Sequence, residues 1–367
     1  MLDFKTFLHA GRNRRNILKS MGVAAVGFSL TGAFAGGGKR EAPSFFNGEE
    51  AKLNFYNWDT YIGETTLEDY KDKTGVDVNM TLFKDNYELF SKLRRGKQEY
   101  DVIVPTNDFV ERMAAAGMLE EIDQGQIPNL ENIAPEYRNE TISKYSVPYT
   151  WLVLGIGYRK SKVKVVPDSW KVMFESDEYR GRIAVLSSAG DMFRLYGKYI
   201  GKSLNNITNV DIITIDEMMI KQKPNIKYFH QDDGQDLLLK DKVDLVIEYN
   251  GDIVQVMMED PDIGFVIPKE GSQLMADHLC IPKGAPHPKN AHAFINYLLD
   301  AEVGKKIAET ILYPTPNAAA KALMSDDYKN NKVIFPPAAV LAKCEYARFN
   351  PAVQQEYEES FASMRAN

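Results

Sequence analysis

The chain has 367 residues, of which 44% are hydrophobic, and this is enough for a packed core and excludes a chain that is disordered throughout. Its 44 Lys and Arg are outnumbered by 51 Asp and Glu, so the formal net charge is −7, whereas a protein that binds duplex nucleic acid normally carries a basic surplus. Only two cysteines occur, Cys280 and Cys344, and there is no CxxC motif, so zinc and redox motifs rich in thiols are excluded.

The first 35 residues follow the pattern of an export signal. Paired arginines, Arg14 and Arg15, precede an apolar run that ends in small residues at Ala33 and Ala35. A basic start, an apolar stretch and a small-residue exit are typical of a secretory signal peptide, and the run is too short to span a bilayer. The arginine pair resembles a twin-arginine signal, with an ordinary secretory signal as the alternative. We therefore predict export, cleavage near Ala35 and a flexible lead over residues 36–50.

Export would place the two cysteines in an oxidising compartment, where Cys280 and Cys344 could form a disulfide. Cys280 lies in the apolar run over residues 279–281, so it could equally be a buried free thiol. The sequence leaves both possibilities open.

Beyond residue 50, short apolar runs alternate with helical patterns. The predicted strands cover residues 53–57, 76–82, 100–104, 152–158, 182–186, 226–229, 243–249, 264–267 and 279–281. The predicted helices cover residues 66–74, 88–95, 109–116, 192–201, 215–221, 235–240, 252–258, 289–299, 302–310 and 318–324, with a further short helix after 168–170. Strands that alternate with helices predict right-handed βαβ units and a mainly parallel sheet. The length predicts two or three domains, and the two series of strands and helices indicate two lobes.

The segments at the predicted strand ends carry aromatic residues, acids or both, and none of them carries Lys or Arg. They cover residues 56–62, 105–109, 187–191, 248–252 and 274–277. In a two-lobe α/β fold such ends face the cleft that binds ligand. Carboxylates neutralise ammonium groups, and ring faces attract cations and bury methylene groups. The pattern therefore predicts a linear, apolar ligand with positive ends.

Structural roles are the alternative for several of these residues. Asp108 and Asp191 could be helix N-caps, and Trp58 could belong to the core. The acidic stretch over residues 231–234 fits the start of a helix better than a calcium loop.

Several motifs resemble those of the spermidine/putrescine-binding proteins of bacterial ABC importers, and the resemblance covers about residues 51–340. They are Phe55-Tyr56-Asn57-Trp58 with Tyr61, Tyr100-Asp101-Val102-Ile103-Val104-Pro105, Ser146-Val147-Pro148-Tyr149-Thr150-Trp151, Pro224-Asn225-Ile226-Lys227-Tyr228-Phe229-His230, Ile267-Pro268-Lys269-Glu270-Gly271 and Ala308-Glu309-Thr310-Ile311-Leu312-Tyr313-Pro314-Thr315-Pro316-Asn317. The resemblance implies the α/β, two-lobe periplasmic binding protein fold of type II, with parallel-sheet lobes joined by a two-segment hinge. Lobe 1 would comprise residues 51–155 plus 277–320, and lobe 2 residues 158–274 plus 325–367.

The resemblance also implies a ligand site. Its residues would be Trp58, Tyr61, Asp108, Asp191, Tyr249, Asp252, Asp277 and Tyr313, with Glu248 as a further candidate. Tyr249 stands where the family usually has tryptophan, and Asp108 replaces a Ser or Tyr. Met275 replaces an aromatic wall, and Ser188 stands where spermidine-type members carry a second acid, so the choice of ligand does not transfer directly.

The implied function is that of a periplasmic receptor without enzymatic activity. It would capture a polyamine, putrescine or spermidine, and deliver it to the permease subunits and ATPase of an ABC importer. We expect a monomer that uses no cofactor or metal and has no nucleic-acid partner.

Two other classes of function remain open. The same fold could bind a different ligand, such as iron, another small cation or a thiamine-like molecule, and Tyr249 and Tyr313 are compatible with iron. Paired acids across a cleft could also be a carboxylate-based glycosidase. The chain has no HExxH, GxSxG or phosphate-loop motif, so other enzyme classes lack support.

Overall fold

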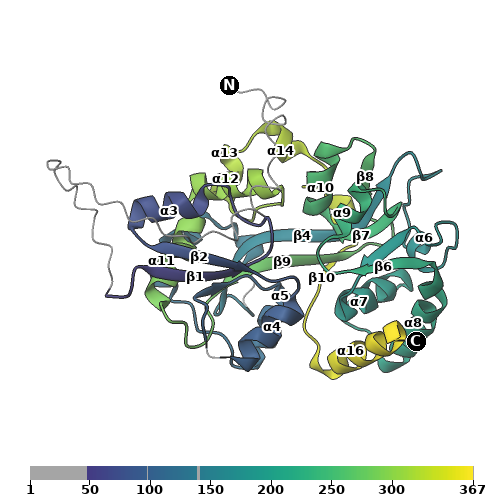
Figure 1. Ribbon diagram of the computed structural model, residues 1–367, viewed down its shortest axis with the longest axis horizontal. Helices are drawn as coiled ribbons and strands as arrows, with labels where there is room; N and C mark the ends of the chain where they lie inside the picture. Colours follow the sequence, from purple (N-terminus) through teal and green to yellow (C-terminus); the bar gives the residue numbers. More distant parts are fainter. Residues whose placement is uncertain (1–47, 97, 139–140, 367) are drawn as a thin grey trace, which may run out of the picture. The chain divides into compact units, whose positions relative to one another are not determined.

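The computed structural model describes residues 48–96, 98–138 and 141–366 (Figure 1). The predicted signal peptide and most of the predicted lead, residues 36–47, lie outside that part. In the described part, ten strands join in one sheet with the order β2-β1-β3-β9-β4-β7-β5-β6, to which β10 adds beside β9 and β8 beside β4. The strands are β1 (Lys52–Asn57), β2 (Asp77–Leu82), β3 (Val102–Ile103), β4 (Ser146–Arg159), β5 (Ile183–Leu186), β6 (Ile226–His230), β7 (Leu245–Tyr249), β8 (Ile263–Val266), β9 (Gln273–Cys280) and β10 (Glu345–Tyr346).

The long strand β4 joins two segments of this sheet. Its first part, residues 146–153, runs antiparallel to β9, and its second part, residues 154–159, runs antiparallel to β7 and β8. We call β1, β2, β3, β9 and β10 the first sheet segment, and β5 to β8 the second sheet segment. The sheet is mixed rather than mainly parallel. Pairs such as β1–β2 and β5–β6 are parallel, as the sequence predicts, but the strands that cross between the segments run the other way.

The helices pack on these strands, with α11 against β1, α3 against β2, and α9 and α10 against β7. They are α3 (Thr66–Thr74), α4 (Asn86–Arg95), α5 (Asn107–Ala115), α6 (Lys171–Phe174), α7 (Ala189–Tyr199), α8 (Asn209–Gln222), α9 (Gly234–Leu239), α10 (Asn250–Glu259), α11 (Pro288–Leu298), α12 (Ala301–Ile311), α13 (Ala318–Leu323), α14 (Asp326–Asn330), α15 (Ala338–Leu341) and α16 (Pro351–Ala366). Short 3-10 turns cover Gln124–Gln126, Pro128–Asn132, Pro135–Tyr137 and Lys223–Asn225.

Local sequence signals explain where several helices begin and end. Helix α3 ends at Gly75, whose φ of 79° is a left-handed conformation that glycine adopts without strain. Helix α8 begins with a capping box, in which the side chains of Thr208 and Asp211 each accept a hydrogen bond from the other's backbone N–H. The prediction placed the start of α8 at residue 215, because it followed the apolar residues and not this cap.

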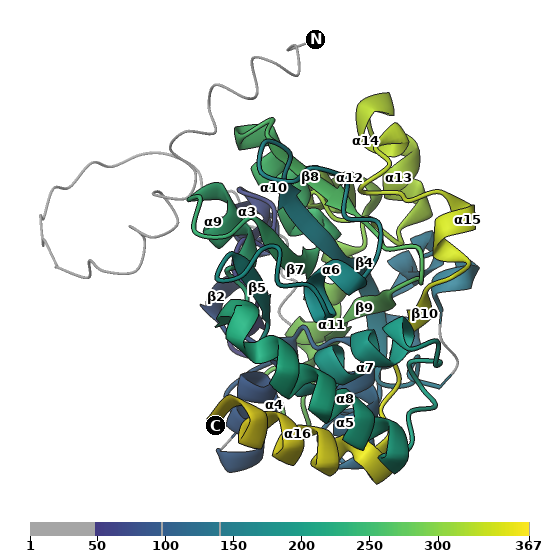
Figure 2. The same ribbon diagram turned by 90° about the vertical axis from the view of Figure 1, so that its right-hand side faces the viewer.

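The C-terminal helix α16 returns to the second sheet segment and packs on α7 and α8 (Figure 2). Val353, Tyr357, Phe361 and Met364 form its buried face, and the ring of Tyr357 stacks on Phe193 of α7 at 4.7 Å. The sequence pattern predicts no helix over residues 351–366, so α16 is an element that the sequence did not indicate.

The hydrophobic core runs under both sheet segments, with Leu53, Phe294, Trp170 and Phe193 fully buried. Both cysteines are free thiols, so of the two alternatives the structure favours the buried thiol for Cys280. None of the helices in the described residues is long and apolar enough to cross a membrane.

Candidate functional site

Asp277 of β9 lies at the centre of the candidate site. It pairs with Thr150 of β4 across a register shift, and with Thr106 just before α5. Its side chain is 4% exposed, and burial raises its pKa to about 7. Oδ2 accepts a 2.6 Å hydrogen bond from the hydroxyl of Tyr61 and a 3.4 Å one from that of Thr150. Oδ1 is buried and has no hydrogen-bond partner among the described residues.

Two buried tyrosines link Asp277 to a second carboxylate. The ring of Tyr61 meets the ring of Tyr313 edge-on, with 5.1 Å between centroids, and the hydroxyl of Tyr313 is hydrogen-bonded to Asp252. Burial, together with the adjacent carboxylates, raises the pKa of both hydroxyls well above the ordinary value, so both stay neutral. The structure thus brings together four of the predicted residues.

Glu248, at the end of β7, contributes a further buried carboxylate. Its side chain is 0% exposed, and Oε1 accepts a 2.9 Å hydrogen bond from the backbone N–H of Tyr249. Oε2 has no hydrogen-bond partner in the described part of the chain and faces Nδ1 of His230 at 3.6 Å. Burial lowers the pKa of His230 to about 4, so this imidazole is neutral at pH 7 and does not balance the carboxylate.

Asp232 joins these acids, and its segment also leads into helix α9 at Gly234, as the sequence predicts. It follows β6, and burial with the carboxylates of Asp252 and Glu248 raises its pKa well above the ordinary value. We call Asp232, Glu248, Asp252 and Asp277 the acidic cluster. The strand-end argument finds Asp232 when it is applied to β6 as well.

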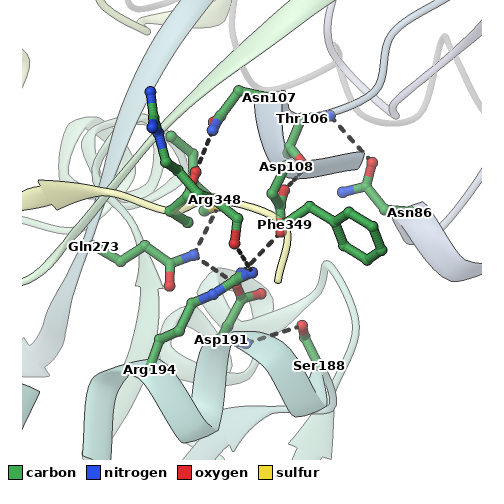
Figure 3. Close-up of polar contacts among 12 residues, drawn as sticks. Asn86, Thr106, Asn107, Asp108, Ser188, Asp191, Arg194, Gln273, Arg348 and Phe349 are labelled. Carbon is green, nitrogen blue, oxygen red and sulfur yellow. Dashed lines mark hydrogen bonds and ion pairs between the residues drawn. The ribbon is translucent and has the colours of Figure 1, made fainter. Parts of the chain in front are cut away.

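Asp108 and Asp191 have a different environment, because both face Arg194 of α7 (Figure 3). Nη1 of Arg194 lies 2.8 Å from Oδ2 of Asp108 and 3.8 Å from Oδ1 of Asp191, and its Nη2 donates to the carbonyl of Arg348 at 2.9 Å. The side chain of Arg194 is 4% exposed. The strand-end segments themselves contain no Lys or Arg, but Arg194, three residues beyond one of them, reaches both acids. Arg194 follows Asp191 by three residues on one helix face, a spacing that would have indicated it.

Other side chains of the chain complete the hydrogen bonding of these two acids. Thr106 donates its hydroxyl to Oδ1 of Asp108 at 2.7 Å, and Gln273 donates Nε2 to Oδ1 of Asp191 at 2.6 Å. Burial raises the pKa of Asp191, and Arg194 opposes that rise. Ligand roles for Asp108 and Asp191 stay predictions, but each carboxylate already has partners within the chain.

The two remaining predicted residues, Trp58 and Tyr249, have different surroundings. Trp58 is half-buried, donates its indole N–H to the carbonyl of Val104 at 2.8 Å and packs on Phe83 with 4.4 Å between centroids. Burial raises the pKa of the Tyr249 hydroxyl well above its ordinary value, and the carboxylates of Asp191 and Glu248 raise it further. Tyr249 is therefore near both the acidic cluster and the pair of acids at Arg194. Their roles as ligand-contacting rings stay predictions.

Among the described residues, no group of three or more His, Cys, Asp or Glu has an arrangement that could hold a metal ion. An open hollow of about 760 Å³ lies elsewhere, along α4, and none of the predicted site residues line it.

Gly251 provides a test of how tightly Tyr313 is held. A Cβ atom at this position would lie 2.4 Å from Cδ2 and Cε2 of Tyr313. We expect Gly251→Ala to displace the ring and to lower the free energy of unfolding by about 1–3 kcal/mol, as overpacking does. Urea unfolding would measure it, with Gly96→Ala as the control, because a Cβ there meets nothing closer than 3.5 Å. Equal stability of both variants would show that the ring moves freely.

The comparisons with known proteins agree with one another. The family of bacterial extracellular solute-binding proteins matches residues 65–336. The chain is 31% identical over 320 residues to the spermidine/putrescine-binding periplasmic protein of Salmonella typhimurium, covering 86% of this chain and 91% of that protein. It is 30% identical to the putrescine-binding periplasmic protein PotF of Escherichia coli, with the same coverage of both chains. A Listeria monocytogenes structure named as a spermidine/putrescine ABC transporter superposes with a TM-score of 0.82, at 27% identity, over 86% of this chain and 99% of that one. The fold is thus the two-lobe fold of periplasmic binding proteins.

Proposed function

Because the chain belongs to the family of bacterial extracellular solute-binding proteins, we propose that it captures a polyamine and delivers it to an ABC importer. The family consists of transport receptors, and the relatives named above are periplasmic spermidine/putrescine- and putrescine-binding proteins. The proposal therefore includes a location in the periplasm and permease subunits as partners. It also includes export through the N-terminal segment, with cleavage near Ala35.

The proposed ligand rests on one observation, namely that the buried carboxylates of Asp277 and Glu248 have no Lys or Arg beside them in the described part of the chain. In the described part of the chain, neither Asp277 nor Glu248 forms an ion pair with Lys or Arg, and each has a buried oxygen without a hydrogen-bond partner. A buried carboxylate without a partner is costly, and a ligand ammonium would both neutralise it and donate the missing hydrogen bonds. An anionic ligand would increase the repulsion.

The tyrosines suit the rest of such a ligand. Tyr61 and Tyr313 present ring surface next to Asp277 and Asp252, and their hydroxyls already donate to those two carboxylates. A methylene chain packed on the rings would gain about 0.8 kcal/mol per buried CH₂. The expected ligand is therefore a chain of methylene groups with ammonium ends.

Capture requires the site to open, because Glu248, Asp252 and Asp277 are each less than 10% exposed. We propose that the two sheet segments, with their helices, move as lobes about the crossing strands; in this division β10, which the predicted boundaries place in lobe 2, belongs to the first lobe. A ligand that contacts both segments would favour the closed arrangement by its differential affinity for it.

Calorimetric titration tests the proposal. The purified protein, unfolded and refolded to remove any ligand carried from the cell, would be titrated with putrescine, cadaverine, spermidine and spermine, and with maltose and glycine as controls. We expect at least one amine to bind with a dissociation constant of about 1 µM or tighter, which corresponds to about −8.2 kcal/mol. Binding of maltose or glycine with no response to any amine would refute a polyamine receptor.

A further inference from the structure

Arg194 is unusual in this site because it is a buried cation placed among acids predicted to bind cations. Its side chain is 4% exposed, and its guanidinium contacts Asp108 and Asp191 at 2.8 and 3.8 Å. Asp108 lies at the start of α5, which follows the first sheet segment's β3, whereas Arg194 lies on α7, which follows β5 of the second. The ion pair between Asp108 and Arg194 therefore spans the two segments (Figure 3).

The pair Asp108 and Asp191 differs from the pair Asp277 and Glu248 in how far the chain itself neutralises and hydrogen-bonds the carboxylates. Asp108 receives hydrogen bonds from Thr106 and Arg194, and Asp191 receives one from Gln273 in addition to its contact with Arg194. Asp277 and Glu248 each keep a buried oxygen without a hydrogen-bond partner in the described residues. One end of the site therefore holds a cation supplied by the chain, and the other end requires a cation from outside.

We propose that Arg194 occupies the place of a ligand ammonium and thereby restricts the site to short diamines. This inference rests on the proposed function and names the substrate class within it. A diamine places both of its ammonium groups at the acidic cluster. A triamine such as spermidine has a third ammonium, which would have to lie near the Arg194 guanidinium or displace it from Asp108 and Asp191.

The guanidinium is well suited to hold this position against a ligand. It is planar and always charged, and here it donates to a carboxylate and to the carbonyl of Arg348 at once. Displacing it would cost these buried hydrogen bonds, and moving it would leave Arg194 itself without partners in the protein interior. A third ammonium group at Arg194 would therefore cost more binding free energy, through the lost hydrogen bonds of the guanidinium, than its own contacts with Asp108 and Asp191 would return.

Replacing Arg194 tests the inference. In the unchanged protein we expect putrescine or cadaverine to bind at least about tenfold more tightly than spermidine. Arg194→Gln frees both acids, so the ratio of spermidine to putrescine affinity should rise at least about tenfold, whereas Arg194→Lys keeps a cation and should change it little. Arg112→Gln is the matched control, because it removes another ion pair between α5 and the second segment's helices, Arg112 to Glu358 at 2.9 Å, without touching these acids.

A double variant distinguishes the effect of the freed carboxylates from the effect of the space that the arginine side chain leaves. Asp108→Asn with Arg194→Gln removes the ion pair as a whole, so it leaves one fewer free carboxylate, and the gain for spermidine should be smaller than in Arg194→Gln alone. If Arg194→Gln does not fold, the comparison of this double variant with Asp108→Asn alone replaces it, and an equal ratio in those two would refute the inference.

The outcomes distinguish the two levels of the proposal. If the unchanged protein binds no polyamine, the proposed function is wrong and the inference falls with it. If it binds polyamines but already prefers spermidine, or if Arg194→Gln leaves the ratio within about twofold, the receptor function stands and the role of Arg194 is refuted.

Discussion

Asp277→Asn should raise the dissociation constant for the best-binding polyamine at least about 100-fold at pH 8, because it would leave a ligand ammonium buried without its counter-charge. Asparagine has the same shape as aspartate, and its Oδ1 can still accept the hydrogen bond that Tyr61 donates at 2.6 Å. The loss should therefore fall on binding and not on folding. Calorimetric titration of the two proteins measures it, with Asp72→Asn on the exposed surface of α3 as the control.

The affinity of the site for polyamine should also depend on pH, because Asp277 must lose its proton to bind an ammonium group. Burial raises the pKa of Asp277 to about 7 in the ligand-free protein, whereas an ammonium favours the carboxylate. Below pH 7 the ligand must therefore displace a proton, so the affinity should fall by up to about tenfold per pH unit as the pH decreases. Titrations in two buffers with different enthalpies of ionisation would detect the released proton near pH 6.5. Proton uptake on binding, or an unchanged affinity in Asp277→Asn, would contradict the assignment.

The sequence predicted the fold well where local signals determine the structure. Helix α3 begins and ends as predicted, because Gly75 supplies the left-handed residue that closes it. Strands such as β5 and β7 were found within a residue or two, because both are short runs of buried apolar residues between turns. These elements depend on their own residues and little on their partners.

The elements that were predicted poorly depend on distant partners. Strand β4 begins at Ser146, six residues before its predicted start, and pairs there with β9, whose beginning was also missed. The first residues of β4 and of β9 are buried because the two strands pair in the middle of the sheet. A pairing between segments that are distant in the sequence leaves no local pattern from which either start could be predicted. The predicted strand over residues 100–104 has ladder partners only at Val102 and Ile103.

The same distinction holds for the candidate site. The strand-end pattern predicted Asp277, Asp252 and Tyr61, and the family resemblance added Tyr313; the structure brings these four into contact or close proximity. The pattern could not show that Asp108 faces Arg194, because that contact joins helices from different sheet segments. Composition along the sequence identifies which charges are near a cleft, whereas the fold decides which of them are already neutralised.

Glu248→Gln should stabilise the ligand-free protein while it weakens binding. The carboxylate is fully buried, Oε2 faces Nδ1 of His230 at 3.6 Å, and burial raises the pKa of Glu248 well above its usual 4.5. Nε2 of His230 lies 3.1 Å from the carbonyl of Ile247 and must be the protonated nitrogen, so Nδ1 carries a lone pair. Two acceptors then face each other, and this arrangement favours a proton on Glu248. Glutamine supplies an N–H at this position at every pH.

The direction in which stability changes with pH follows from the difference between the folded and unfolded pKa values of Glu248. Between its unfolded pKa and its higher folded pKa, the native state holds a proton that the unfolded state has released, so stability falls by up to about 1.4 kcal/mol per pH unit as the pH rises. The variant lacks this loss, so its advantage in unfolding free energy should increase as the pH rises from 4.5 to 7.5. Urea unfolding at several pH values measures the difference, and Glu217→Gln on the exposed face of α8 is the control.

The binding of polyamine should change in the opposite direction. If Glu248 contributes its charge to the ligand, the dissociation constant of the variant should rise about tenfold, the cost of losing one partly compensated carboxylate. A variant that is more stable and binds less tightly identifies Glu248 as a residue kept for binding at the expense of stability. A variant that is less stable at pH 7.5 would instead mean that the carboxylate has a stabilising partner in the native protein.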